Sequence, residues 1–185
     1  MIFKKLSWIL KKKELKKIKL LVLDVDGVLT DGGLYLSSKG ELIKKFNVKD
    51  GLGIKLLQHN QIEVVFLSGG SGGSTEIRAQ QLNIKYCYVK IKDKNKAILK
   101  IQEKLGFSKD ETAYLGDDIN DFVVKNNVSL FISPSDSCEI ILNKADLILA
   151  KKGGNGAIRE LSEKILKSQN KYKSYFESGW TDIND

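Results

Sequence analysis

Short apolar segments recur along the chain, and segments with helical periodicity separate them. Several apolar segments are continuous rather than alternating, which is typical of parallel strands covered by helices on both faces. The apolar segments lie at residues 18–24, 62–68, 84–89, 112–117, 128–133 and 145–150. Helical patterns lie at about residues 50–59, 74–82, 94–105, 118–125 and 155–168. This alternation predicts an α/β fold with a doubly wound, mostly parallel sheet.

One segment interrupts the alternation directly after the first predicted strand. Residues 32–48, GGLYLSSKGELIKKFNV, have two β-like halves around Ser-Ser-Lys-Gly and predict a protruding β-hairpin. The sequence shows no long linker and no internal repeat, so we expect one globular domain over residues 18–168. A basic segment, residues 1–17, precedes this domain. A polar and aromatic tail, residues 169–185, follows it, and we expect the tail to be loosely ordered.

The formal charge of +8 is concentrated at one end of the chain. Eight lysines and a single acid, Glu14, lie within residues 1–20, so the rest of the chain is close to neutral. The apolar positions of this segment have helical spacing: Ile2, Phe3, Leu6, Ile9 and Leu10. We interpret the segment as a solvated helix docked on its own domain or on a neighbouring subunit. Contact with an acidic surface is the alternative.

Composition also excludes several classes of protein. No stretch is long enough to cross a bilayer, and residues 1–20 lack the uninterrupted apolar centre of a secretory signal, so we expect a cytoplasmic protein. The single histidine, His59, excludes histidine-based catalytic triads and histidine-rich zinc sites. Catalysis would have to use carboxylates, lysines, hydroxyls and a bound hard cation.

Acidic and hydroxyl side chains follow the predicted strands at the point where each strand ends. In open α/β sheets, ligands bind beyond the carboxyl ends of the strands. The first strand leads into DVDGVLTDG, the second into LSG and the fourth into GDDIND, while Lys94 opens the helix after the third. Carboxylates brought together at one edge would repel one another, so the sequence predicts a cation such as Mg²⁺ among them.

These residue types suit phosphoryl transfer. Asp24 is placed to attack phosphorus as a nucleophile and form an acyl-phosphate. Asp26, two residues further on, is placed to protonate the leaving oxygen and then to deprotonate the attacking water. The phosphoryl oxygens would be held by the Ser68 hydroxyl, the Gly69 amide and the Lys94 ammonium.

In this order, DVDGVLTDG, LSG, Lys94 and GDDIND resemble the haloacid-dehalogenase (HAD)-like phosphatases over nearly the whole predicted domain. Within that superfamily, the chain is similar to the 3-deoxy-D-manno-octulosonate 8-phosphate (KDO 8-P) phosphatases. The hairpin is followed by FNVKDGLGIK and later by GGNGAIRE at residues 153–160. The gaps between the motifs hold a hairpin and single helices, which leaves no room for a cap domain. The resemblance implies a capless homotetramer whose hairpins pack together and whose sites are closed by a neighbour.

The resemblance also implies roles for individual residues. Mg²⁺ would be bound by Asp24, the main-chain carbonyl of Asp26 and Asp117. Asp118 and Asp121 would support them. The sugar acid would be contacted by Asn47, Val48, Lys49, Asp50, Gly51, Lys55 and Arg78. The residues alone leave another interpretation open, because residues 47–51 are equally typical of a strand end with a helix cap. Lys55 and Arg78 are equally typical of solvated helix faces.

The chain has only two arginines, and both fall within these motifs. Arg78 offers a planar fork for the acid group of a substrate, whereas Arg159 could equally order the chain's own C-terminal segment. The family usually has an arginine two positions after the hydroxyl residue, where this chain has Gly70. This departure leaves two substrates open, KDO 8-P and a nonulosonate 9-phosphate. Ser74 or Thr75 is expected to cap the helix that carries Arg78.

Two functions of other classes are also open. A phosphoacceptor signalling domain pairs strand-end acids with a hydroxyl and a lysine on a doubly wound sheet, but such a domain ends near 120 residues and has no late GDDxxD. A nucleic-acid-binding function would rest on residues 1–20 alone. We therefore expect a small-molecule partner, a sugar-acid phosphate, rather than a nucleic acid.

Overall fold

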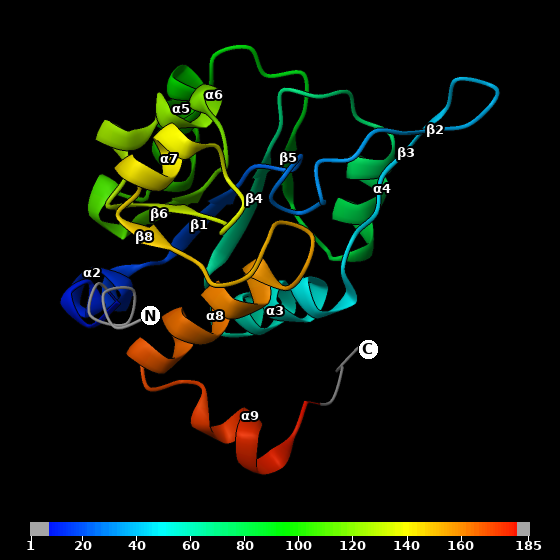
Figure 1. Ribbon diagram of the computed structural model, residues 1–185. Coiled ribbons are helices and arrows are strands. Elements are labelled where there is room, and N and C mark those ends of the chain that lie inside the picture. The colour runs from blue at the N-terminus through cyan, green and yellow to red at the C-terminus, as the bar shows by residue number, and fades with distance from the viewer. Residues whose placement is uncertain (1–7, 181–185) are drawn as a thin grey trace.

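The computed structural model describes residues 8–180 and is built around one parallel sheet (Figure 1). Six strands are ordered β5-β4-β1-β6-β7-β8, and all neighbouring pairs are parallel. The strands are β1 Leu20–Leu23, β4 Glu63–Leu67, β5 Tyr86–Tyr88, β6 Thr112–Leu115, β7 Leu130–Ser133 and β8 Leu147–Ile148. Each lies within one of the six predicted apolar segments. The predicted doubly wound α/β fold is therefore confirmed.

Helices cover both faces of this sheet (Figure 1). One face is covered by α2, α3, α4 and α8, and the other by α5, α6 and α7. The helices are α2 Lys12–Lys17, α3 Val48–His59, α4 Ser74–Gln81, α5 Lys94–Leu105, α6 Ile119–Phe122, α7 Glu139–Lys144, α8 Ala157–Ser168 and α9 Lys173–Ser178. Short 3₁₀ turns occur at η1 Lys109–Glu111 and η2 Lys125–Asn127.

Successive residues of β1 point to opposite faces of the sheet and belong to two separate cores. Leu21 and Leu23 pack in the core that contains residues of α3 and α8. Leu20 and Val22 pack in the core that contains residues of α5 and α7. All four side chains are fully buried. The strand that leads into Asp24 is thus fixed from both sides.

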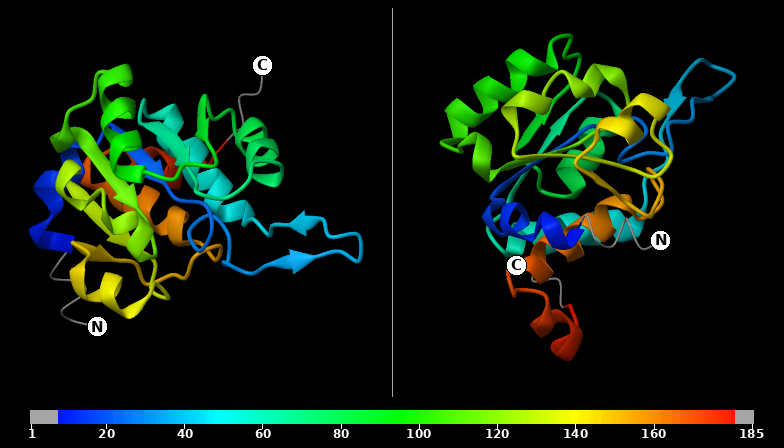
Figure 2. Two further views of the ribbon diagram at one scale, coloured as in Figure 1. Left: turned by 90° about the horizontal axis from the view of Figure 1, so that it is seen from above. Right: turned by 60° about the vertical axis from the view of Figure 1, so that its left-hand side comes forward.

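The predicted hairpin is present and projects away from the domain (Figure 2). Its strands are β2 Tyr35–Leu36 and β3 Leu42–Ile43, which pair antiparallel. An isolated bridge between Thr30 and Phe46 closes its base. The paired part is shorter than the predicted 32–48, because most of that segment is an extended connection to the domain.

Three helical segments differ from the expectations. The helix predicted at 118–125 ends at Phe122 and continues as η2. Helix α7 was not predicted, because it has six residues and its N-cap, Cys138, supplies no side-chain cap. In the tail, for which loose order was expected, residues Lys173–Ser178 form α9, and residues 181–185 lie outside the described residues. The Tyr175 hydroxyl of α9 accepts a hydrogen bond from Asn60 Nδ2 at 2.6 Å, which ties the tail to the end of α3.

The described part of the basic N-terminal segment is a helix docked on its own domain. Leu15 of α2 is buried in the core shared with α8, while most of the lysines of α2 point outward. Residues 1–7, which carry part of the predicted apolar face, lie outside the described residues. Among the described residues, none of the helices combines the length and apolar character needed to span a membrane.

Candidate active site

The residues predicted for the reaction lie at the carboxyl edge of the sheet. Asp24 follows β1, Ser68 follows β4, Asp117 follows β6, and Lys94 is the first residue of α5. The Lys94 ammonium lies 2.7 Å from Asp24 Oδ1 and 2.6 Å from Asp121 Oδ1. All three of these charged side chains are buried. The fold therefore brings together acids and a lysine that are far apart in the sequence, as predicted.

Asp121 holds the other members of this cluster in place. Besides the bond from Lys94, its carboxylate accepts hydrogen bonds from the Tyr114 hydroxyl at 2.6 Å and from the Asp117 amide at 3.1 Å. Asp118 caps α6 by accepting from the Ile119 amide at 2.7 Å. Asp121 thus contacts the cluster directly, whereas the Asp118 carboxylate bonds to the start of α6. Tyr114 was not predicted as a site residue, because a tyrosine within an apolar strand is typical of the core and nothing local shows which partner its hydroxyl has.

Three carboxylates of this cluster lie close enough together for a hard cation to bind among them, and Asp121 is already bonded to Lys94. Oxygens of Asp24, Asp117 and Asp121 all lie within 4.8 Å of one another. Burial, and next the nearby Asp121, raise the pKa of Asp24 to about 7. Burial, and next Asp24, raise the pKa of Asp117 to about 8. Carboxyl groups that retain protons at neutral pH have too little positive charge around them, and an all-oxygen donor set is what Mg²⁺ prefers.

Lys94 keeps its charge within this cluster. Its burial acts to lower the pKa of the ammonium, but the charges of Asp24 and Asp121 outweigh burial and raise that pKa. A single ammonium shared by two carboxylates still leaves net negative charge, since Asp117 adds a third acid. The donor set thus has room for a divalent cation beside the lysine.

Gly27 allows the first motif to approach the GDD motif closely. A Cβ atom at Gly27 would lie 2.1 Å from Asp117 Oδ2, and the residue has φ +82°. Both the space and the backbone conformation therefore require glycine. The fourth position of DVDG is thus a condition for placing Asp117 beside Asp24.

The loop after β4 is held by the segment that follows β5. The Ser68 carbonyl accepts from the Ile91 amide at 3.0 Å, and the Gly70 carbonyl accepts from the Lys90 amide at 2.8 Å. Ser68 is buried and its hydroxyl accepts from the Gly70 amide at 3.0 Å, while Gly69 is exposed. This turn, fixed at both ends, presents the residues predicted to bind the phosphoryl group.

Helix α4 begins differently from the expectation. Gly73 is its N-cap, and neither Ser74 nor Thr75 caps it. The Gly73 amide instead donates to Glu76 Oε2 at 3.0 Å. The Thr75 hydroxyl accepts a hydrogen bond from the ammonium of Lys44, which also pairs with Asp26. Sequence analysis missed Lys44, because nothing local distinguishes it among the lysines of this chain.

The residues expected to contact the sugar acid gather at the start of α3 and on α4. A pocket of about 320 Å³ is lined by Val48, Gly51, Leu52, Lys55, Arg78, Gln81, Leu82 and Trp180. Its lining does not include Asp24, Asp26, Ser68 or Lys94. Arg78 Nε is buried without a hydrogen-bond partner among the described residues, so this guanidinium retains a donor. Lys49, at the first turn of α3, is exposed and is not among the lining residues.

Two of the predicted substrate contacts also have partners within the protein. Asn47 caps α3 by accepting from the Lys49 amide at 2.8 Å. Asp50 is buried, and its carboxylate accepts from the backbone amides of Gly156 at 3.1 Å and Arg159 at 2.9 Å. These contacts favour the helix-cap interpretation for Asn47 and a structural role for Asp50. The Arg159 side chain donates to the Tyr172 hydroxyl at 3.3 Å and so orders the C-terminal segment.

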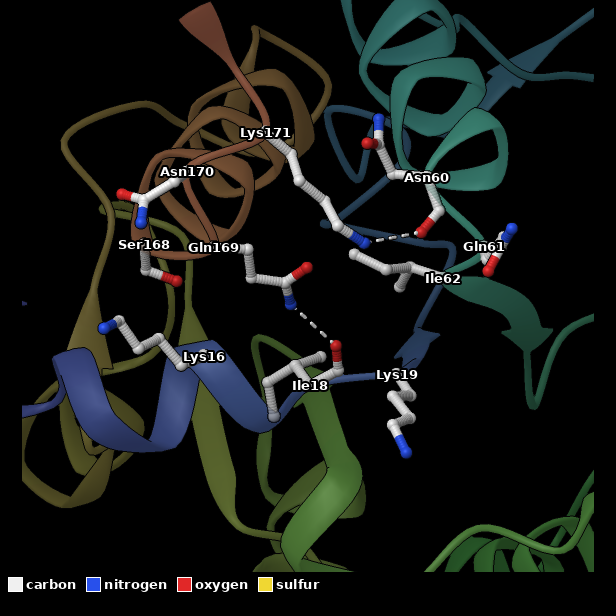
Figure 3. Close-up of a pocket in the computed structure, with 10 residues that line it drawn as sticks. All are labelled: Lys16, Ile18, Lys19, Asn60, Gln61, Ile62, Ser168, Gln169, Asn170 and Lys171. Carbon is white, nitrogen blue, oxygen red and sulfur yellow. Dashed lines mark hydrogen bonds between the residues drawn. The ribbon is translucent and has the colours of Figure 1, made fainter.

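A second pocket lies at the opposite edge of the sheet (Figure 3). It has a volume of about 430 Å³ and is lined by residues that precede β1 and β4 and by residues that follow α8. Within it, Gln169 donates to the Ile18 carbonyl and Lys171 to the Asn60 carbonyl (Figure 3). Because the clustered acids lie at the other edge of the sheet, this pocket is not the candidate active site.

Comparison with known proteins agrees with this arrangement. No protein-family model matches the chain. The chain is 37% identical over 156 residues to the 3-deoxy-D-manno-octulosonate 8-phosphate phosphatase KdsC of Escherichia coli K12, covering 84% of this chain and 83% of that protein. It is 38% identical over 159 residues to KdsC of Haemophilus influenzae, covering 86% and 88% of the two chains.

Solved structures give the same result. The Moraxella catarrhalis 3-deoxy-D-manno-octulosonate 8-phosphate phosphatase, in complex with magnesium, phosphate and KDO, superposes with a TM-score of 0.88 at 36% identity, covering 91% of this chain and 97% of that one. The cobalt-bound Haemophilus influenzae phosphatase gives 0.84 at 37% identity, covering 88% and 95%. The chain belongs to the 3-deoxy-D-manno-octulosonate 8-phosphate phosphatase family of the HAD superfamily.

Proposed function

We propose that the protein is a Mg²⁺-dependent phosphatase that hydrolyses KDO 8-P to KDO and phosphate. The observation that carries the proposal is the buried Lys94 ammonium bridging Asp24 and Asp121 beside Asp117. This set supplies a nucleophile, a counterion and a cation site at one edge of the sheet. Membership of a family of phosphoric monoester hydrolases supports the assignment.

The side chains divide the reaction into two displacements at phosphorus. In the first, an Asp24 carboxylate oxygen forms a bond to phosphorus, the bond from phosphorus to the sugar oxygen breaks, and Asp26 gives its proton to that oxygen. In the second, a water oxygen forms a bond to phosphorus while Asp26 takes a proton from that water. The bond from phosphorus to the Asp24 oxygen breaks, which releases phosphate and restores the Asp24 carboxylate. Ser68, the Gly69 amide and Lys94 hold the phosphoryl oxygens as their charge changes.

The cation site would be formed by Asp24, the Asp26 carbonyl and Asp117. Mg²⁺ bound there supplies positive charge that neutralises the carboxylates and the phosphoryl oxygens. Asp118 and Asp121 would support the site without binding the cation. Asp118 caps α6, and Asp121 bonds to Lys94 and to the Asp117 amide.

The acid group of the substrate would be bound in the pocket beside α3 and α4. Arg78 has a buried donor without a partner among the described residues, and Val48 and Lys55 also line the pocket. Lys49, next to Val48 in the chain, would contact the substrate from the first turn of α3. A nonulosonate 9-phosphate is the second candidate, because Gly70 leaves the loop after Ser68 without the arginine that KDO 8-P phosphatases usually have. The same catalytic residues would serve both substrates.

The proposed assembly is a homotetramer with packed hairpins. The hairpin exposes Leu34 at 79%, Leu36 at 68% and Ile43 at 56%, a set of apolar side chains that solvated hairpins seldom carry. Light scattering coupled to size exclusion should give four times the chain mass. A Leu34→Ser, Leu36→Ser variant should give a smaller species, and an unchanged mass would contradict packing through the hairpin.

The substrate is tested with purified protein and Mg²⁺ by comparing kcat/KM for KDO 8-P, a nonulosonate 9-phosphate and p-nitrophenyl phosphate. We expect the highest value for KDO 8-P and many turnovers per subunit, which a phosphoacceptor signalling domain would not show. Asp24→Asn should lower turnover by roughly 10³-fold or more while keeping the circular dichroism spectrum. A higher kcat/KM for the nine-carbon acid would reassign the substrate, and near-normal turnover by Asp24→Asn would refute the mechanism.

A further inference from the structure

Lys44, directly after β3 of the hairpin, reaches into the candidate active site. Its ammonium lies 2.8 Å from Asp26 Oδ1 and 3.0 Å from Asp26 Oδ2, so it contacts both oxygens of one carboxylate. It also lies 3.3 Å from the hydroxyl of Thr75 at the start of α4. One side chain thus links the hairpin, the loop after β1 and α4.

The burial of Lys44 sets it apart from a surface ion pair. Its side chain is only 5% exposed, whereas the neighbouring Lys45 side chain is 64% exposed and pairs with Asp31 at 3.0 Å. Fixing a lysine stem in a buried position costs side-chain entropy and desolvation, which an exposed pair such as Lys45 with Asp31 avoids. The buried Lys44 stem has fewer rotamers available than the exposed Lys45 stem, so its ammonium keeps a fixed position against Asp26.

Gly70 leaves the space in which this contact forms. A Cβ atom at Gly70 would lie 2.9 Å from Asp26 Oδ2, 3.3 Å from Ser68 Oγ and 3.7 Å from Lys44 Nζ. The bare backbone at Gly70 thus lets the Asp26 carboxylate rest beside the Ser68 turn, with the lysine behind it. Any side chain at position 70 would compete for this space.

Asp26 needs such a constraint more than the other acids do. Its side chain is 47% exposed, whereas Asp24 and Asp121 are buried and bonded to Lys94. An exposed carboxylate samples several rotamers, and a proton donor is effective only when its oxygen is held within hydrogen-bond reach of the leaving group. The contacts of the carboxylate therefore bear on catalysis.

We propose that Lys44 is the positioning residue of Asp26, holding its carboxylate beside the Ser68 turn where it transfers a proton to the leaving oxygen. This inference rests on the proposed function, in which Asp26 is the proton donor. It assigns the hairpin a part in the reaction chemistry through Lys44, in addition to its exposed apolar side chains.

The test compares Lys44→Met with Lys45→Met, two neutral replacements at neighbouring hairpin positions. Kinetics use two probes, KDO 8-P and p-nitrophenyl phosphate, because an alkoxide leaving group needs a proton and p-nitrophenolate does not. We expect Lys44→Met to lower the single-turnover rate of leaving-group release from KDO 8-P by on the order of 10²-fold, with a much smaller loss for p-nitrophenyl phosphate and little change in KM. Lys44→Arg should recover part of the loss, and Lys45→Met should match the wild type.

A double-mutant cycle separates positioning from independent substrate binding. If Lys44 acts through Asp26, adding Lys44→Met to Asp26→Asn should cause no further loss of kcat. A multiplied loss, an equal loss of the leaving-group release rate with both probes, or a rise in KM alone would overturn the inference. A crystal structure of Lys44→Met gives an outcome that does not depend on activity: the Asp26 carboxylate should leave its place beside Gly70, and an unmoved carboxylate would also overturn the inference. Failure of the wild type to hydrolyse KDO 8-P would count against the proposed function alone.

Discussion

The Nζ of Lys94 lies 2.7 Å from Oδ1 of Asp24, and both side chains are almost fully buried. Removing one member of a buried ion pair leaves the other charge without compensation, at a cost of about 3–5 kcal/mol. We therefore expect Lys94→Met to lower the free energy of unfolding by about this amount and to remove most activity. Urea unfolding and kcat/KM measure the two effects.

The control for this variant is Lys96→Met, an exposed lysine on the same helix. It should leave both quantities within error of the wild type, because surface charges contribute little to stability. Equal losses of stability and of kcat/KM in the two variants would mean that any neutral replacement of a lysine disturbs α5. Such a result would contradict the counterion role of Lys94.

The stability of the metal-free protein should fall as pH rises. Burial and neighbouring acids raise the pKa of Asp24 to about 7 and that of Asp117 to about 8, well above the usual value of 3.8. Between about pH 4 and pH 8 the folded protein therefore holds more protons than the unfolded chain does. Unfolding then becomes easier as pH rises, by up to about 1.4 kcal/mol per pH unit for each group.

Urea unfolding with EDTA at pH 5, 6, 7 and 8 measures this slope. The range avoids the region near pH 2, where Glu111 and Glu163, whose pKa values are lowered to about 2, take up protons. Excess Mg²⁺ should weaken the slope, because the cation binds the deprotonated carboxylates. Asp117→Asn should also weaken the pH dependence in EDTA. A free energy of unfolding that increases with pH would contradict the raised pKa values.

Gly70→Arg should lower activity rather than restore a missing substrate contact. Its Cβ would lie 2.9 Å from Asp26 Oδ2, and its guanidinium would compete with Lys44 for that carboxylate. We expect kcat for KDO 8-P to fall on the order of 10-fold or more. Gly70→Ala, which adds only the Cβ, separates crowding from competition, and a gain of KDO 8-P activity in Gly70→Arg would show that the loop merely lacks a side chain.

Asp50→Ala should act on stability more than on substrate binding. The carboxylate accepts from two backbone amides at the start of α8, and leaving buried donors unpaired costs about 1–3 kcal/mol. Thermal unfolding should detect this loss, while the exposed Asp110→Ala serves as the control. A raised KM with an unchanged melting temperature would instead indicate that Asp50 contacts the substrate.

The arrangement of strands could be predicted because hydrophobic runs and strand ends are local signals. The six apolar segments contain the six strands, and the strand-end rule placed Asp24, Asp117 and Lys94 together before any contact was known. Helix α7 escaped prediction since a six-residue helix without a capping side chain has almost no local signal. Its stability comes from burying Ile141 against the sheet.

The parts of the site that could not be predicted depend on contacts between distant segments. Lys44 meets Asp26 across 18 residues and Thr75 across 31, and neither separation corresponds to a helical or strand period. Asp50 has the sequence context of a helix start, but which partner its carboxylate meets is decided by the packing of α3 on α8. Charge type is visible in the sequence, whereas the direction of a side chain is set by tertiary packing.

The hydrogen bonds from Gln169 to the carbonyls of Leu15 and Ile18 join segments about 150 residues apart. During synthesis on the ribosome, α2 and the surface of α3 that faces α8 stay uncovered until α8 has emerged, because their partners are made last. The apolar side chains on this face of the sheet therefore stay partly exposed until synthesis of α8 is complete. Nascent chains stalled before residue 157 should be cleaved by proteases at α2 and α3. Cleavage at α5 should be slower, because α5 packs against the other face of the sheet, which does not need α8.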